Sequence, residues 1–165
     1  MISKADMLAL VRTLPVPAPW DRAAFIDGVA VLRGRPIRVV PTVDKLGMSA
    51  CGLWMKRDSD DIIIHEAGTS DYHIDQIVCH EIGHMVLEHD GGPHKGADPN
   101  GGDQPKMIFA TALVGFDPSA GVVLGRTAFD DDRERDAELF ASIVMLAAAE
   151  GPDQTSMMSS VFFRP

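Results

Sequence analysis

A glutamate between two histidines marks the part of the chain best suited to chemistry, the stretch IVCHEIGHMVLEH at residues 77–89. On a helix, His80 and His84 project from successive turns of one face, so their imidazoles can reach the same metal ion. Glu81 lies beside them and is placed to take a proton from a water molecule that such a metal activates. The spacing is that of the HExxH motif and predicts a zinc site with Glu81 as general base.

The rest of this helix separates an apolar face from the two histidines. The apolar stripe at helical spacing consists of Ile74, Val78, Ile82 and Met85. Gly83 costs roughly 1 kcal/mol in a helix interior, and we interpret it as space for the metal or for an adjoining strand. The competing interpretation is an ordinary buried helix in an α+β domain without metal, because a motif with three fixed positions also arises by chance.

Two histidines leave a catalytic zinc short of a third protein ligand. In the HExxHxxGxxH pattern that ligand is a histidine one turn further along, but here His89 comes one residue early and Leu87 replaces the glycine. His94 stands in a glycine-rich loop, and mobile loops hold ligands poorly. A carboxylate from a second helix is therefore the favoured third ligand.

The last predicted helix offers such a carboxylate in DRERDAELFASIV, residues 132–144. Glu134 and Glu138 lie four residues apart, so they face the same way. We assign Glu134 as the third metal ligand and Glu138 as an acid that hydrogen-bonds a ligand histidine. The reverse assignment, and Asp136 as the ligand, stay open.

His73 lies two helical turns before His80 on the same side of the helix. From that position it could line a substrate cleft and stabilise an oxyanion. A surface histidine at the start of a helix is the simpler interpretation, and it is the one we favour.

Cap and turn signals place the elements that hold these residues. The predicted helices span residues 3–13, 21–33, 72–89, 117–125 and 131–149, and the predicted strands span 35–43, 50–57 and 60–67. Asp21 and Gly34 are the expected N-cap and end of the second helix. Asp117, with Pro118 directly after it, is the expected start of the short fourth helix, and Gly125 its end.

The strand connections are too short for crossover helices, so we expect a small antiparallel or mixed sheet, with antiparallel favoured. The HExxH helix and the glutamate-bearing helix pack on it, which makes an α+β fold. The length predicts a single domain over residues 1–165. Within it we expect N-terminal helices at 1–35, a catalytic core at 36–147, a flexible loop at 90–106 and a tail at 150–165.

Composition narrows the functional classes. Hydrophobic residues make up 45% and charged residues 24%, the balance of a globular protein. Fifteen basic against 24 acidic residues give a net charge of -9, so direct nucleic-acid binding is not expected. No window reaches the roughly 18 apolar residues of a membrane span. Of the two cysteines, Cys79 lies within the apolar helix, which argues against a disulfide framework and for a cytoplasmic location.

The two motifs together resemble the ImmA/IrrE family of bacterial metallopeptidases, whose small catalytic domain combines H-E-[IL]-G-H with a later E-x-E-A-[NE]-x-F-A helix. Here the first reads HEIGH at residues 80–84 and the second ERDAELFA at residues 134–141. The upstream CGLW and DDIII are similar to the short actinobacterial members. The likeness covers roughly residues 36–147, with Asp136 at the second acidic position and a longer spacer between the motifs.

The resemblance implies a zinc-dependent protease fold in which His80, His84 and Glu134 bind zinc and Glu81 is the general base. Members often cleave a helix-turn-helix repressor, so the implied substrate is a protein partner that regulates transcription. We therefore expect a zinc endopeptidase of narrow specificity. The alternative is a non-catalytic zinc-binding module that regulates a transcription factor by binding it.

Overall fold

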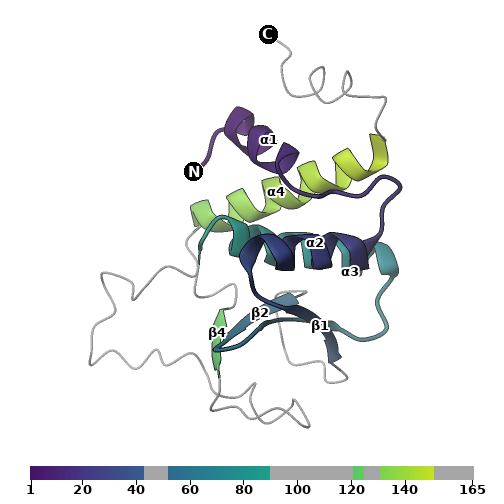
Figure 1. Ribbon diagram of the computed structural model, residues 1–165, viewed down its shortest axis with the longest axis vertical. Helices are drawn as coiled ribbons and strands as arrows, with labels where there is room; N and C mark the ends of the chain where they lie inside the picture. Colours follow the sequence, from purple (N-terminus) through teal and green to yellow (C-terminus); the bar gives the residue numbers. More distant parts are fainter. Residues whose placement is uncertain (43–51, 90–120, 125–130, 151–165) are drawn as a thin grey trace, which may run out of the picture.

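The computed structural model describes residues 1–42, 52–89, 121–124 and 131–150. In this part of the chain the order of elements is α1 (Lys4–Arg12), α2 (Arg22–Arg33), β1 (Ile37–Thr42), β2 (Gly52–Arg57), β3 (Asp61–Glu66), α3 (Asp71–Val86), β4 (Gly121–Leu124) and α4 (Asp131–Glu150). The helices lie over one face of the sheet, with α2 and α3 next to the strands and α4 and α1 further out (Figure 1). The expected α+β class is confirmed.

The sheet is mixed, with strand order β1-β3-β2-β4. β2 and β3 pair antiparallel, with Trp54 opposite Ile63, whereas β1 runs parallel to β3. The favoured antiparallel arrangement is thus correct for β2 with β3 and wrong for β1 with β3. Short connections constrain the relative direction only of strands that are consecutive in sequence. Here β2 lies along one edge of β3, and β1 pairs with the other edge.

β4 overturns the helix predicted at residues 117–125. Gly121–Leu124 form a strand that pairs antiparallel with β2. The β-branched Val122 and Val123 favour an extended chain, and the edge of β2 supplies hydrogen-bond partners that no local cap signal reveals. Asp117 and Pro118, which suggested a helix start, lie outside the described residues.

Side-chain caps begin both N-terminal helices, and the predicted caps Asp21 and Gly34 of α2 are confirmed. Ser3 Oγ accepts a hydrogen bond of 3.1 Å from the Asp6 amide at the start of α1. Asp21 Oδ1 accepts one of 3.0 Å from the Ala24 amide at the start of α2. Gly34 ends α2 with a φ of 65°, in the left-handed region that favours glycine.

α3 is the central helix of the fold. Its N-cap Ser70 accepts a hydrogen bond from the His73 amide at 3.2 Å. Every residue in Ile77–Met85 except His80 is buried, because the sheet covers one side of the helix and α4 the other. The prediction of a single apolar face is therefore too simple, since the histidine side is also covered.

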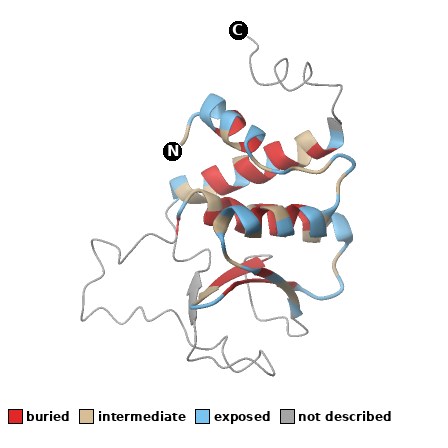
Figure 2. Ribbon diagram, viewed as in Figure 1, coloured by how far each residue is buried: buried red, intermediate tan, exposed pale blue. Residues whose placement is uncertain are grey.

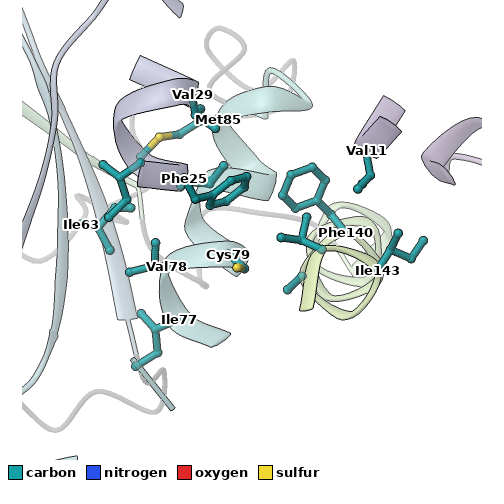
Figure 3. Close-up of a cluster of buried hydrophobic side chains, with 14 of the residues drawn as sticks. Val11, Phe25, Val29, Ile63, Ile77, Val78, Cys79, Met85, Phe140 and Ile143 are labelled. Carbon is teal, nitrogen blue, oxygen red and sulfur yellow. The ribbon is translucent and has the colours of Figure 1, made fainter. Parts of the chain in front are cut away.

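One cluster of buried side chains joins all four helices to the sheet (Figure 2). Its largest fully buried members include Trp54 of β2, Phe25 of α2, Phe140 of α4 and Met7 of α1. In Figure 3, Cys79 of α3 is directed toward α4, where its thiol lies 3.9 Å from the Met145 sulfur. This shared core fixes α3 relative to α4.

A buried carboxylate ties the sheet to the helices above it. Asp61 has no exposed surface and lies within 3.3 Å of Arg33 and 3.4 Å of Arg35. It also accepts a hydrogen bond of 3.1 Å from the Trp54 indole nitrogen. Arg33 in turn donates to the Met85 carbonyl near the end of α3. The arginines offset the buried charge and connect α2, β3 and α3.

Some predictions fall on parts of the chain that the structure does not describe. The loop predicted at 90–106 lies outside the described residues, and so does the tail at 150–165 apart from Glu150. The single-domain assignment stays a prediction. Among the residues that are described, no helix combines the length and the apolar character needed to cross a membrane.

Candidate metal centre

α3 carries His80 and His84 on successive turns of the side that faces α4. Their Nε2 atoms are 3.1 Å apart. His84 is 1% exposed, whereas the His80 side chain keeps about a fifth of its surface, at 20%. The His84 imidazole is therefore buried, whereas the His80 imidazole is partly exposed to solvent.

Glu134, in the first turn of α4, completes a cluster of three possible ligands. Its Oε2 lies 3.5 Å from His80 Nε2, and its Oε1 lies 3.3 Å from His84 Nε2. One ligand atom from each of these residues falls within 4.8 Å of the others, so the three side chains could hold one metal ion. The structure thus brings together the three residues that the sequence singled out as metal ligands.

The close approach of α3 and α4 depends on Gly83. A Cβ atom at this position would lie 3.0 Å from Phe140 Cδ1 and 3.3 Å from the Ala137 Cα. Gly83 therefore faces α4, and its interpretation as space for the metal or a strand is wrong. Ala137 of α4 is fully buried, and its small side chain also lets the two helices approach closely.

Glu81 points toward the sheet side of the site. A Cβ atom on Gly52, the first residue of β2, would lie 3.2 Å from Glu81 Oε1. Glu81 is 6% exposed. The missing side chain at Gly52 thus leaves space for a carboxylate that would otherwise have to move, and Glu81 is held between the helix and the first residue of β2.

Burial keeps His84 in its neutral form. Removal from water, together with the positive charges that His80 and His89 can carry and the charge of Arg133, lowers the pKa of His84 to about 3. A neutral imidazole has a nitrogen lone pair available, which is the form that binds metal ions.

The alternatives for the third ligand differ in where the structure places them. Asp136 is turned toward the N-terminus, where both of its carboxylate oxygens accept from the Ile2 amide at 3.0 and 3.1 Å. Asp136 is therefore not among the three clustered side chains, because its carboxylate is hydrogen-bonded to the segment before α1. Glu138 lies one turn beyond Glu134 and is exposed, and its contact with a ligand histidine stays a prediction. His94 lies outside the described residues.

His73 occupies the first turn of α3 and is half-buried. Its backbone amide is used by the Ser70 cap, at 3.2 Å. The role of its imidazole in a substrate cleft stays a prediction.

His89 is the residue at this site that sequence reasoning missed. Its Nδ1 lies 2.9 Å from Nδ1 of His84, and it is 9% exposed. In the sequence, His89 is considered only as a third metal ligand, and it comes one residue too early for the HExxHxxGxxH pattern. Its real position arises because α3 ends at Val86 rather than at His89, so the chain turns back onto the helix.

Comparison of the chain with protein-family models, with curated proteins and with solved structures finds no match. Function must therefore be inferred from the site itself.

Proposed function

We propose that the chain is a zinc-dependent endopeptidase of narrow specificity, which hydrolyses a peptide bond in a protein partner. The observation that carries this proposal is the convergence of His80, His84 and Glu134 on one point, with Glu81 beside them on the sheet side. These are the residue types of a hydrolytic metal site, and they come from two helices that pack tightly together.

The donor atoms and their spacing fit zinc. Two imidazole nitrogens and one carboxylate oxygen are a ligand set of catalytic zinc, in which a fourth position stays open. For tetrahedral zinc with bonds of about 2.0–2.1 Å, ligand atoms stand about 3.3–3.4 Å apart. Here the two Nε2 atoms are 3.1 Å apart, His84 Nε2 lies 3.3 Å from Glu134 Oε1 and His80 Nε2 lies 3.5 Å from Glu134 Oε2. With one atom taken from each residue, all three lie within 4.8 Å of one another, so small side-chain shifts would bring them to these distances. Magnesium and calcium prefer oxygen ligands throughout, so nitrogen donors disfavour both.

The chain's own residues divide the remaining work. When bound, zinc supplies a Lewis acid that polarises the scissile carbonyl and lowers the pKa of a water molecule. Glu81 would act as the general base, taking a proton from the attacking water and passing it to the leaving amine. Because Glu81 is only 6% exposed, little bulk water surrounds its carboxylate. Water therefore weakens the interaction of this negative charge with nearby charges only slightly.

The chain's charge supports a basic protein partner. A net charge of -9 attracts positively charged surfaces and repels nucleic acid. DNA-binding domains carry clustered lysine and arginine, so a helix-turn-helix repressor has complementary charge. This agrees with the substrate class implied by the ImmA/IrrE resemblance.

The metal assignment can be tested on the purified chain by elemental analysis. About one zinc per chain is expected in the parent, with loss of zinc in His84→Ala and in Glu134→Ala. Asp136→Asn is the matched control, since it changes an acid in the same turn of α4 that faces the N-terminus. Zinc kept by Glu134→Ala, or lost from Asp136→Asn, would contradict the ligand assignment.

Catalysis is tested separately with Glu81→Gln, which removes the carboxylate and keeps the side-chain size. In cells of the organism that encodes the chain, labelling of new protein N-termini should reveal a cleavage product with the parent and none with Glu81→Gln. If both chains bind zinc and give identical N-termini, the non-catalytic regulatory module is correct and the peptidase is not.

A further inference from the structure

The chain makes a tight turn immediately after α3. Glu88 has a φ of 54°, in the left-handed region. The His89 amide donates to the His84 carbonyl at 2.9 Å, and the Glu88 amide donates to the Met85 carbonyl at 3.4 Å. These two bonds form a Schellman motif, which satisfies the last carbonyls of the helix. The turn returns His89 to the helix beside His84.

The two rings meet through the same kind of nitrogen. Nδ1 of His84 lies 2.9 Å from Nδ1 of His89, and the ring centroids are 5.1 Å apart. One hydrogen bond between two imidazole nitrogens needs one N–H and one lone pair. The Nε2 of His84 faces His80 and Glu134, so it needs its lone pair for a metal, and its proton must stand on Nδ1.

We propose that His89 is a positioning residue of the metal centre. Its Nδ1 accepts a hydrogen bond from Nδ1–H of His84, so the proton of His89 stands on its own Nε2. This bond fixes the tautomer and the orientation of the His84 ring, and it presents the Nε2 lone pair to the metal. The inference rests on the proposed metal site and adds to it a residue that contacts no metal.

Arg133 holds the main chain of this turn in place. Its guanidinium donates to the His89 carbonyl at 3.2 Å. Arg133 directly precedes Glu134 in α4. The same helical turn therefore supplies the ligand Glu134 and fixes His89, which orients the ligand His84. The two halves of the metal centre are thereby linked through His89.

Two substitutions separate this hydrogen bond from simple packing. His89→Asn keeps an acceptor close to the position of Nδ1, whereas His89→Leu keeps apolar bulk without an acceptor. Glu88→Gly is the local control, because glycine adopts the same left-handed turn and leaves both rings unchanged.

The first readout is zinc affinity, measured by competition with a chromophoric chelator. We expect His89→Leu to bind zinc about 10–100-fold more weakly than the parent. His89→Asn and Glu88→Gly should bind it nearly as well as the parent. Equal affinity in the parent and His89→Leu would overturn the proposal.

The second readout is the tautomer of the His89 ring in the zinc-loaded chain, assigned by nitrogen NMR. The expected result is a proton on Nε2 of His89, because its Nδ1 accepts from His84 Nδ1–H. A zinc-loaded parent that carries the His89 proton on Nδ1 would refute the role of His89. If the parent binds no zinc, the proposed function fails and the inference fails with it, whereas normal zinc binding with the other His89 tautomer overturns the inference alone.

Discussion

Gly52→Ala tests the contact between β2 and α3 that positions Glu81. A Cβ atom at this position would lie 2.3 Å from Ile77 Cγ2, a side chain that is 5% exposed. Carbon atoms normally approach to about 3.5 Å, so a shift of about 1.2 Å (3.5 − 2.3) is needed to relieve the contact. Neither the strand nor the buried isoleucine can make such a shift without disturbing the core.

The expected effect on stability follows from two opposing terms. Overpacking of a core costs about 1–3 kcal/mol. Replacing glycine by alanine within a strand returns about 0.5–1 kcal/mol of backbone entropy. Taking the middle of each range, about 2 less about 0.75, we expect Gly52→Ala to lower the free energy of unfolding by about 1 kcal/mol. Zinc affinity should be unchanged, because the three ligands lie on the α4 side of α3.

Urea denaturation of a double-mutant cycle gives the measurement. Ile77→Ala removes the atom that Gly52→Ala would meet, so the two changes should couple by at least about 1 kcal/mol. Gly28→Ala is the matched control, since its Cβ would lie 2.4 Å from Pro15 Cγ, away from Ile77. Combined with Ile77→Ala, it should be additive to within about 0.5 kcal/mol.

A Gly52→Ala chain that is as stable as the parent, or more stable, would refute the close contact. The contact is also refuted if Gly52→Ala and Ile77→Ala are additive. Either result would mean that β2 and α3 are not in close contact at this point, and that Glu81 is not confined by the strand.

Three further predictions concern buried ionisable groups. Asp61→Ala should cost about 3–5 kcal/mol in urea unfolding because it leaves two partly buried arginines without their shared carboxylate; a loss below about 1 kcal/mol would contradict this. The Arg57 guanidinium, by its hydrogen bond, holds the pKa of Asp60 below its ordinary value of 3.8. This stabilisation is complete above that value and is lost as the pH falls through the lower folded-state pKa, so Asp60→Asn should be less stable than the parent at neutral pH and approach it in acid. A difference that does not change with pH would be inconsistent with the ion pair. Burial raises the pKa of the Cys79 thiol from 9.0 to about 12, which reduces its thiolate at pH 8 about a thousandfold. In a Cys51→Ser background, a disulfide reagent should therefore react with the folded chain at least that much more slowly than with the unfolded chain, and comparable rates would exclude a buried thiol.

Local sequence was sufficient for the helical part of the candidate site. His80 and His84 share a face because four residues make about one helical turn. Glu134 could be selected because acids capable of reaching that face are few, and α4 places it 3.3 Å from His84. Sequence could not separate Glu134 from Asp136, since both lie in the first turns of one helix. Packing separates them, because Asp136 is taken by the N-terminus.

Signals that depend on a distant partner were missed. β4 carries a local helix signal, yet it is a strand because β2 offers an edge to pair with. β1 pairs with β3 in parallel, since β2 occupies the other edge of β3 and does not lie between them. The turn at Glu88 has no glycine to mark the end of α3, so the helix was expected to continue to His89.

The sequence by itself determined the residue types of the candidate centre, the helical spacing of its histidines and the α+β class, because each depends on contacts within a few residues. Tertiary structure decided which acid completes the cluster, which strand stands at the edge, what Gly83 and Gly52 make room for, and that His89 returns to His84. Those features depend on segments far apart in the chain, and no local pattern records where such segments meet.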